Sequence, residues 1–407
     1  MSLSFGHEFL SIPGPSAMPE RVLRAMHRAS PNIYEGELVD MMPDLEAGLR
    51  RVARTDGHVS IYIGNGHAAW EASLANTLSR GDKVLLLTTG RFGPGWGMMA
   101  RGMGIDVEIL DFGTAAPTDA ARVEARLRAD TGHDIKAVLT VHTDTASSVR
   151  NDIPAIRAAM NAAAHPALLM VDCIASLACE PFETDAWGVD VMVAACQKGL
   201  MTPAGLAFTF HNDKAAEARK SADLVTPYWD WNPRSAPDMF YQRFCGTAPT
   251  HHLYGLREAL AILAEEGIEN TWARHATLAK AVWAAVDAWA EGGIVAANVT
   301  DRAARSIAVT TLRTKGEEAT AIRKWTQGFA GVTLGVGLGL EAGGKMATAH
   351  GADLFRIGHM GHLNPHALLG TLSVTDAALK ALDIPHGDAA LSRAAQVIAE
   401  AGAGFTA

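Results

Sequence analysis

Short apolar runs that alternate with helical patterns dominate the first half of the chain. Seven runs are rich in Val, Ile and Leu, which is typical of strands buried on both faces of a sheet. They lie at residues 58–64, 83–90, 107–112, 136–142, 167–172, 189–195 and 206–211. Between them, apolar residues recur with the period of an amphipathic helix at 67–79, 95–103, 118–130 and 153–164. This alternation predicts an α/β fold with a mostly parallel seven-stranded sheet covered on both faces.

The pattern changes after residue 212. Residues 226–249, TPYWDWNPRSAPDMFYQRFCGTAP, predict an irregular segment, and segments of that length usually carry a function or an interface. A long helix follows at 252–266, with leucines 253, 256, 260 and 263 on one stripe, and a second follows at 270–291. A smaller α+β pattern begins near residue 300 and includes strands at 306–313 and 354–359. We therefore expect an N-terminal segment (1–19), a large α/β domain (20–268) and a small C-terminal α+β domain (269–407).

Composition narrows the classes of partner. The net charge of the 407 residues is −9, whereas a nucleic-acid-binding protein normally shows a basic stripe. No apolar stretch approaches the ~20 residues of a membrane span, and no secretory signal is visible at the start. The four cysteines have no C-x-x-C spacing, and the sixteen histidines form no H-E-x-x-H pair. We expect a cytoplasmic protein with free thiols, no bound metal, no membrane contact and no nucleic-acid partner.

A glycine-containing turn follows the first predicted strand. In IGNGHAAWEA, residues 63–72, Asn65 and Gly66 precede the start of a helix. The backbone N–H groups of Gly66, His67 and Ala68 are expected to be free at the positive end of the helix dipole. The stretch therefore predicts an anion site suited to phosphate, although it would also suit a tight strand-to-helix turn.

Three other strand ends carry polar side chains. Asp172 ends an apolar strand and needs a cationic partner or several donors, while Thr145 offers a hydroxyl or caps a turn. Lys198 follows another apolar run, either as the first solvated residue or as a lysine that does chemistry. Ligands of parallel sheets gather at these strand ends. Together the features suit pyridoxal 5'-phosphate (PLP), with the phosphate at the helix, Asp172 at the pyridinium and Lys198 as the Schiff base.

Several blocks in a fixed order resemble the class V aminotransferases of the alanine–glyoxylate and serine–glyoxylate group. These blocks, spread from about residue 12 to about residue 385, are IPGPSAMPERVL, GNGHAAWEASLANTLSRGDKVL, HTDTASSV, VDCIASL, WGVDVMVAACQKGL, LYGLREALAILAEEGIENTWARH and FRIGHMGHLN. The resemblance implies PLP fold type I and a homodimer whose two active sites are shared between subunits.

The resemblance also implies roles for individual residues. Lys198 and Asp172 resemble the catalytic pair, and Arg356 the arginine that binds the substrate carboxylate as a planar fork. Tyr34 lies in a segment expected at the substrate mouth. The remaining cofactor contacts implied are Asn65, Gly66 and His67 at the phosphate, Phe92 and Ile174 on the two ring faces, Thr145 at O3′, Gln197 near the phosphate, and Thr247 from the partner subunit.

The chain departs from the family pattern at places that bear on the substrate. Residues 33–36, IYEG, stand where many relatives carry HRSP, and residues 346–353, MATAHGAD, are additional. The acidic Glu35 and Glu37 favour a small neutral donor, serine or alanine, with glyoxylate or pyruvate as acceptor. The alternatives are a pyridoxamine–pyruvate or aspartate–glyoxylate aminotransferase, or a non-catalytic PLP-binding protein. A desulfurase is disfavoured because Gln197 precedes the lysine.

Overall fold

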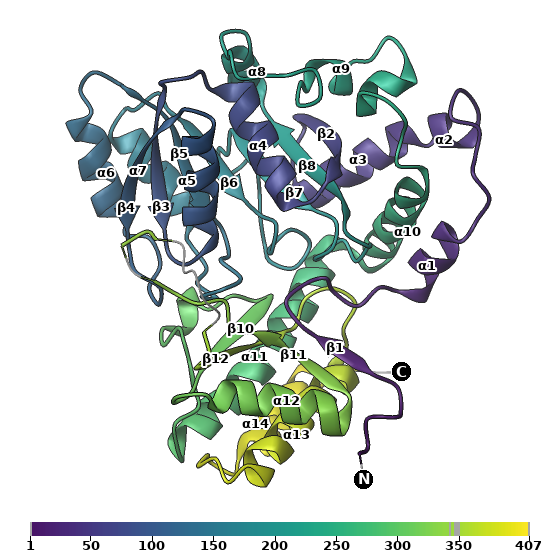
Figure 1. Ribbon diagram of the computed structural model, residues 1–407, viewed down its shortest axis with the longest axis vertical. Coiled ribbons are helices and arrows are strands. Elements are labelled where there is room, and N and C mark those ends of the chain that lie inside the picture. The colour runs from purple at the N-terminus through teal and green to yellow at the C-terminus, as the bar shows by residue number, and fades with distance from the viewer. Residues whose placement is uncertain (1, 342, 346–350, 406–407) are drawn as a thin grey trace.

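The computed structural model describes residues 2–341, 343–345 and 351–405 (Figure 1). Two sheets form two bodies stacked along the long axis of the molecule, and the larger sheet lies in the upper body of the view. The predicted α/β fold class is confirmed. Five residues of the additional stretch 346–353 lie outside the described residues.

The large sheet has seven strands in the order β2-β8-β7-β6-β5-β3-β4, and every strand except β8 runs parallel to the others. Its strands are β2 (His58–Gly64), β3 (Lys83–Thr88), β4 (Asp106–Asp111), β5 (Ile135–Val141), β6 (Leu168–Asp172), β7 (Val191–Ala195) and β8 (Gly205–His211). All seven agree with the predicted runs within two residues.

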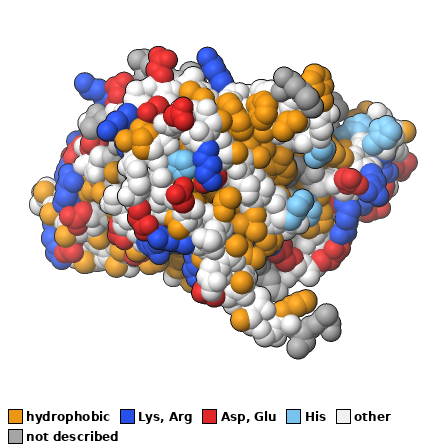
Figure 2. All heavy atoms as spheres, turned by 90° about the horizontal axis from the view of Figure 1, so that it is seen from below, with side chains coloured by type: hydrophobic (Ala, Val, Ile, Leu, Met, Phe, Trp, Pro, Cys, Tyr) orange, Lys and Arg blue, Asp and Glu red, His pale blue; other side chains and the backbone are white. Residues whose placement is uncertain are grey.

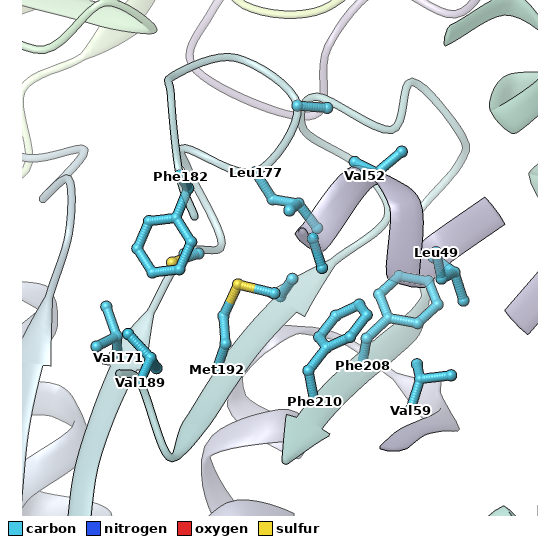
Figure 3. Packing of buried hydrophobic residues seen from close by; sticks show 14 of the residues in the cluster. Leu49, Val52, Val59, Val171, Leu177, Phe182, Val189, Met192, Phe208 and Phe210 are labelled. Atoms are coloured by element: carbon cyan, nitrogen blue, oxygen red, sulfur yellow. The ribbon is translucent and has the colours of Figure 1, made fainter. Parts of the chain in front are cut away.

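Helices cover both faces of this sheet, which explains why its strands read as continuous apolar runs. Leu169 and Val171 of β6 belong to one core, whereas Leu168 and Met170 belong to the other, because successive side chains point to opposite faces. Figure 3 shows the first core, where Phe208 lies below Leu49 and Val52, and Met192 and Val171 lie farther to the left, below Leu177 and Phe182.

The helices on the two faces come from different parts of the chain. The first core receives α3 (Met42–Ala53), α6 (Ala120–Ala129), α7 (Ile153–Ala162) and α10 (Thr250–Glu266). The second core receives α4 (Gly66–Thr77), α5 (Phe92–Gly102) and a residue of α8 (Asp213–Arg219). The leucine stripe predicted for residues 252–266 is buried in the first core along α10.

The smaller sheet has the order β1-β11-β12-β10-β9, with β1 parallel to β11 and the other pairs antiparallel. Its strands are β1 (Phe9–Ser11), β9 (Ala296–Ala297), β10 (Val309–Arg313), β11 (Val332–Val336) and β12 (Leu354–Gly358). The helices packed with it are α11 (Ile268–Glu291), α12 (Glu318–Ala330), α13 (Pro365–Ala381) and α14 (Ala390–Ala401). The N-terminal strand thus belongs to the body built mainly by the C-terminal third of the chain.

Several elements were not predicted from the sequence, and most of them are short, although α3 has twelve residues and a buried apolar face. The segment predicted as irregular, 226–249, contains α9 (Asn232–Ser235) and a 3-10 helix (Phe240–Phe244) between turns. The helices α1 (Glu20–Met26), α2 (Glu37–Asp40) and α3, strands β1, β9 and β11, helix α8, and a second 3-10 helix (Arg302–Ala304) were also not predicted. Within the described ranges, no helix is long and apolar enough to cross a membrane. Figure 2 shows acidic and basic side chains interspersed on the lower face, around a band of apolar ones.

Candidate active site

A pocket lies at the carboxyl ends of strands β2, β3, β5, β6 and β7, where a parallel sheet gathers its ligands. Nine of the twelve residues predicted for the site line it: Asn65, Gly66, His67, Phe92, Thr145, Asp172, Ile174, Gln197 and Lys198. They come from five loops that are far apart in sequence. The structure therefore brings together the predicted phosphate turn, carboxylate, hydroxyl and lysine.

The turn between β2 and α4 forms one end of the pocket. Asn65 caps α4, and its side chain accepts a hydrogen bond from the His67 N–H at 3.0 Å. The Ala68 N–H donates to the Asn65 carbonyl at 2.9 Å. The expectation that three N–H groups are free is thus wrong for two of them, because the cap engages them. A Cβ on Gly66 would overlap the side chain of Ile174, so a larger residue here would displace Ile174 in the pocket.

Asp172 lines the pocket with only 3% of its surface exposed. One carboxylate oxygen accepts the Trp70 indole N–H at 2.8 Å, and the other accepts the Ile174 backbone N–H at 2.7 Å. Burial raises the pKa of Asp172 to about 7, against the lowering effect of these two donors. The carboxylate is therefore poorly compensated by the protein alone, and a cationic group in the pocket would stabilise its charged form.

Lys198 lines the same pocket as Asp172 and is held by the N-terminal segment. Its ammonium donates to the Pro13 carbonyl, and the Ser16 hydroxyl donates to the Lys198 carbonyl at 2.7 Å. Gly14, with a φ of 98°, passes so close that a Cβ would overlap the lysine side chain. Burial, and then the positive charge of Arg356, lower the pKa of Lys198 to about 8. A neutral amine is thus accessible near physiological pH.

The loop after β5 connects the pocket to the smaller sheet. Arg356 of β12 does not line the pocket, but its Nη1 donates to the Thr145 carbonyl at 2.9 Å and its Nε donates to the Val336 carbonyl at 2.8 Å. Asp144 accepts the Phe92 N–H at 2.7 Å, which fixes the start of α5. Arg356, only 7% exposed, is therefore held next to the pocket by backbone carbonyls.

Two predicted residues lie elsewhere in the single chain. Tyr34 is 83% exposed, and Thr247 is exposed on the loop before α10. Neither lines the pocket.

Four lining residues were not predicted: Trp70, Val141, Thr143 and Ala175. A signal existed for Trp70, because it lies one turn into a helix that starts at the predicted ligand turn, and a buried indole N–H usually finds an acceptor. No local pattern indicated Pro13 or Gly14, which reach the site only through tertiary contact.

Gln197 presents an unpaired polar atom. Its Oε1 is buried and has no hydrogen-bond partner among the residues that the structure describes. A buried amide oxygen of this kind normally has a partner, so a ligand with a donor group or a bridging water would complete it. Within the same described ranges, no three His, Cys, Asp or Glu side chains gather closely enough to hold a metal ion.

Comparisons with known proteins agree with this geometry. The family model "Aminotransferase class-V" matches residues 61–325. The chain is 37% identical over 382 residues to a serine–glyoxylate aminotransferase of Methylorubrum extorquens, covering 92% of this chain and 91% of that protein. It is 34% identical to an L-aspartate–glyoxylate aminotransferase of Paracoccus denitrificans, with 92% and 91% covered. The crystal structure of pyridoxamine–pyruvate aminotransferase from Mesorhizobium loti superposes with a TM-score of 0.86 at 25% identity, covering 98% of this chain and all of that one. The chain belongs to the class V aminotransferases.

Proposed function

We propose that the protein is a PLP-dependent aminotransferase that moves an amino group from a small neutral amino acid, serine or alanine, to glyoxylate or pyruvate. The observation that carries the proposal is the meeting of Lys198, Asp172 and the N-terminus of α4 in one pocket. The relative with 37% identity is a serine–glyoxylate aminotransferase, which supports the choice of donor and acceptor.

The residues present suit PLP. Asp172 is a buried carboxylate that accepts two neutral donors, so a protonated ring nitrogen would offset its charge. The N-terminus of α4 favours the phosphate, Phe92 and Ile174 offer the two ring faces, and the Thr145 hydroxyl lies within the same lining. When bound, PLP supplies an electron sink that stabilises negative charge at the substrate α-carbon.

Lys198 and Arg356 act on the substrate. Lys198 Nζ, with a pKa of about 8, can take the proton from the α-carbon of the amino donor. In the reverse half-reaction it can give a proton to the α-carbon of the product formed from the oxo acid. Arg356 binds the α-carboxylate that donors and acceptors share, because its guanidinium is held by two carbonyls and still has donor groups left. Two other arginines that could be considered for this role, Arg243 and Arg257, are each paired with a glutamate.

We further propose a homodimer in which Thr247 and Tyr34 complete the pocket of the partner subunit. Both residues are exposed in the single chain. The family resemblance implies that Thr247 contacts the cofactor phosphate bound by the partner subunit. A cytoplasmic location is consistent with four free cysteines, three of them buried.

Aspartate is the second candidate donor, because one of the two glutamates expected to repel it is paired with arginines. Glu37 forms ion pairs with Arg28 at 2.7 Å and with Arg257 at 2.9 Å, so its charge is offset. The repulsion expected against a second carboxylate on the donor therefore rests on Glu35 alone. A relative of similar identity is an L-aspartate–glyoxylate aminotransferase.

A half-reaction screen tests the proposal. The PLP-loaded protein is mixed with each amino acid in turn, without any acceptor, and the released 2-oxo acid is quantified. We expect serine or alanine to be converted fastest. Equal conversion of aspartate would refute the small neutral donor. Conversion of unphosphorylated pyridoxamine with pyruvate in place of any amino acid would favour the pyridoxamine–pyruvate activity. No conversion at all would leave a PLP-binding protein without transaminase activity.

A further inference from the structure

We propose that Trp70 is a positioning residue for the cofactor: its indole N–H holds the Asp172 carboxylate in the orientation that meets the pyridine nitrogen. The inference rests on the proposed function, since it needs PLP in the pocket. The proposal adds Trp70 of α4 to the contact between Asp172, at the end of β6, and the pyridine nitrogen.

Trp70 lines the pocket and contacts three other residues that line it. Its Nε1 lies 2.8 Å from Asp172 Oδ2, and both residues are almost fully buried. Its ring centroid lies 4.5 Å from that of His67, at the phosphate turn, and 6.3 Å from that of Phe92. On its far side it stacks on Trp96, with centroids 6.1 Å apart and an interplanar angle of 12°. The Trp70 indole therefore contacts the Asp172 carboxylate, His67 of the phosphate turn and the Phe92 ring.

Burial alone does not explain the hydrogen bond. The buried indole N–H groups of Trp96, Trp231 and Trp272 have no partner among the described residues. These three indoles are buried without a protein acceptor in the described part of the chain, whereas the Trp70 N–H donates to the carboxylate that lines the pocket. Trp289 offers a matched comparison, because its Nε1 donates to Asp376 at 2.9 Å within the core of the smaller body, away from the pocket.

The bond has a direct consequence for the carboxylate. Asp172 accepts one N–H on each oxygen, so loss of the indole donor leaves only the Ile174 N–H. The carboxylate then becomes free to rotate away from the ring nitrogen and more ready to hold its own proton. The titratable groups whose charges act on Asp172 are Lys198 and Asp144, and Asp172 in turn acts on the Cys173 thiol.

The test compares two cofactors and two variants. Trp70→Phe keeps an aromatic ring and removes the N–H, while Trp289→Phe removes an equivalent indole–aspartate bond elsewhere. Dissociation constants are measured by equilibrium dialysis for PLP and for its 1-deaza analogue, in which carbon replaces the ring nitrogen. A residue that acts through Asp172 on that nitrogen should affect PLP and spare the analogue, whereas a residue that only packs should affect both.

We expect Trp70→Phe to raise the dissociation constant of PLP about tenfold and that of the analogue less than twofold. Trp289→Phe should leave both within twofold. An equal rise for both cofactors, or no rise for PLP, would overturn the positioning role while leaving PLP binding itself intact. Failure of the proposed function is recognised separately, because the wild type would then show no saturable PLP binding. If Trp70→Phe does not fold, benzothienylalanine at position 70 keeps the shape, lacks only the N–H, and is judged by the same criterion.

Discussion

Replacing Asp172 with asparagine in the cofactor-free protein should make the folded state less sensitive to pH. Burial raises the pKa of Asp172 from its ordinary value of 3.8 to about 7 in the folded protein. The folded state therefore binds this proton more tightly than the unfolded state does. Its contribution to stability is fully present below about pH 4 and is lost progressively as the pH rises to 7.

The magnitude follows from the two pKa values. A shift of about three units corresponds to roughly 4 kcal/mol, and about 2–3 kcal/mol of this change falls between pH 5 and pH 8. Asparagine keeps the shape and an acceptor oxygen for the Trp70 N–H, but it carries no charge. The free energy of unfolding of Asp172→Asn, minus that of the wild type, should thus rise by about 2–3 kcal/mol over that pH range.

The assay is urea unfolding of both cofactor-free proteins at several pH values and one protein concentration. Asp134→Asn, at an exposed aspartate, is the matched control and should stay within about 0.5 kcal/mol of the wild type throughout. A difference between Asp172→Asn and the wild type that is flat with pH would refute the reasoning. Added PLP should stabilise the wild type more than Asp172→Asn at pH 8, because a protonated ring nitrogen offsets the buried charge.

Three further outcomes are expected. Covalent attachment of PLP to Lys198 can be followed by mass spectrometry after borohydride reduction. Its rate should rise with pH and level off a little above pH 8, because burial lowers the pKa of the amine. Lys198→Ala should show no attachment, and a rate still rising at pH 10 would contradict the lowered pKa. Arg356→Lys should raise KM about 30-fold, or roughly 2 kcal/mol, for every amino and oxo acid, because an ammonium cannot reproduce the planar fork. Arg313→Lys, on the neighbouring strand β10, should leave KM unchanged. An effect on one substrate only would argue against a shared carboxylate site. Thr247→Ala should weaken PLP binding about tenfold without dissociating the dimer in sedimentation, and a fully active monomeric wild type would exclude a shared site.

The sequence by itself predicted the features that depend on local pattern. Apolar runs predicted the strands of the large sheet, because a strand buried on both faces holds few charged side chains; the partly exposed strand β4, with Asp106, Glu108 and Asp111, has the most. The exceptions stand out for the same reason: Asp172 and Lys198 end or follow such runs, and both line the pocket. The carboxyl ends of parallel strands meet at one edge of the sheet, so residues from five loops could be assigned to one site.

The tertiary structure alone decided the contacts between distant segments. Trp70 meets Asp172 across 102 positions of the chain, and the Pro13 carbonyl meets Lys198 across 185. Strand β1 pairs with β11 more than 300 residues later, which brings the N-terminal segment over the lysine. Arg356 reaches the Thr145 carbonyl from the second sheet. No local periodicity encodes such contacts, because they depend on how two separately packed sheets are placed. The pKa values of Asp172 and Lys198 depend on the burial and direction of their side chains. Both of these are fixed only when the two sheets are packed together.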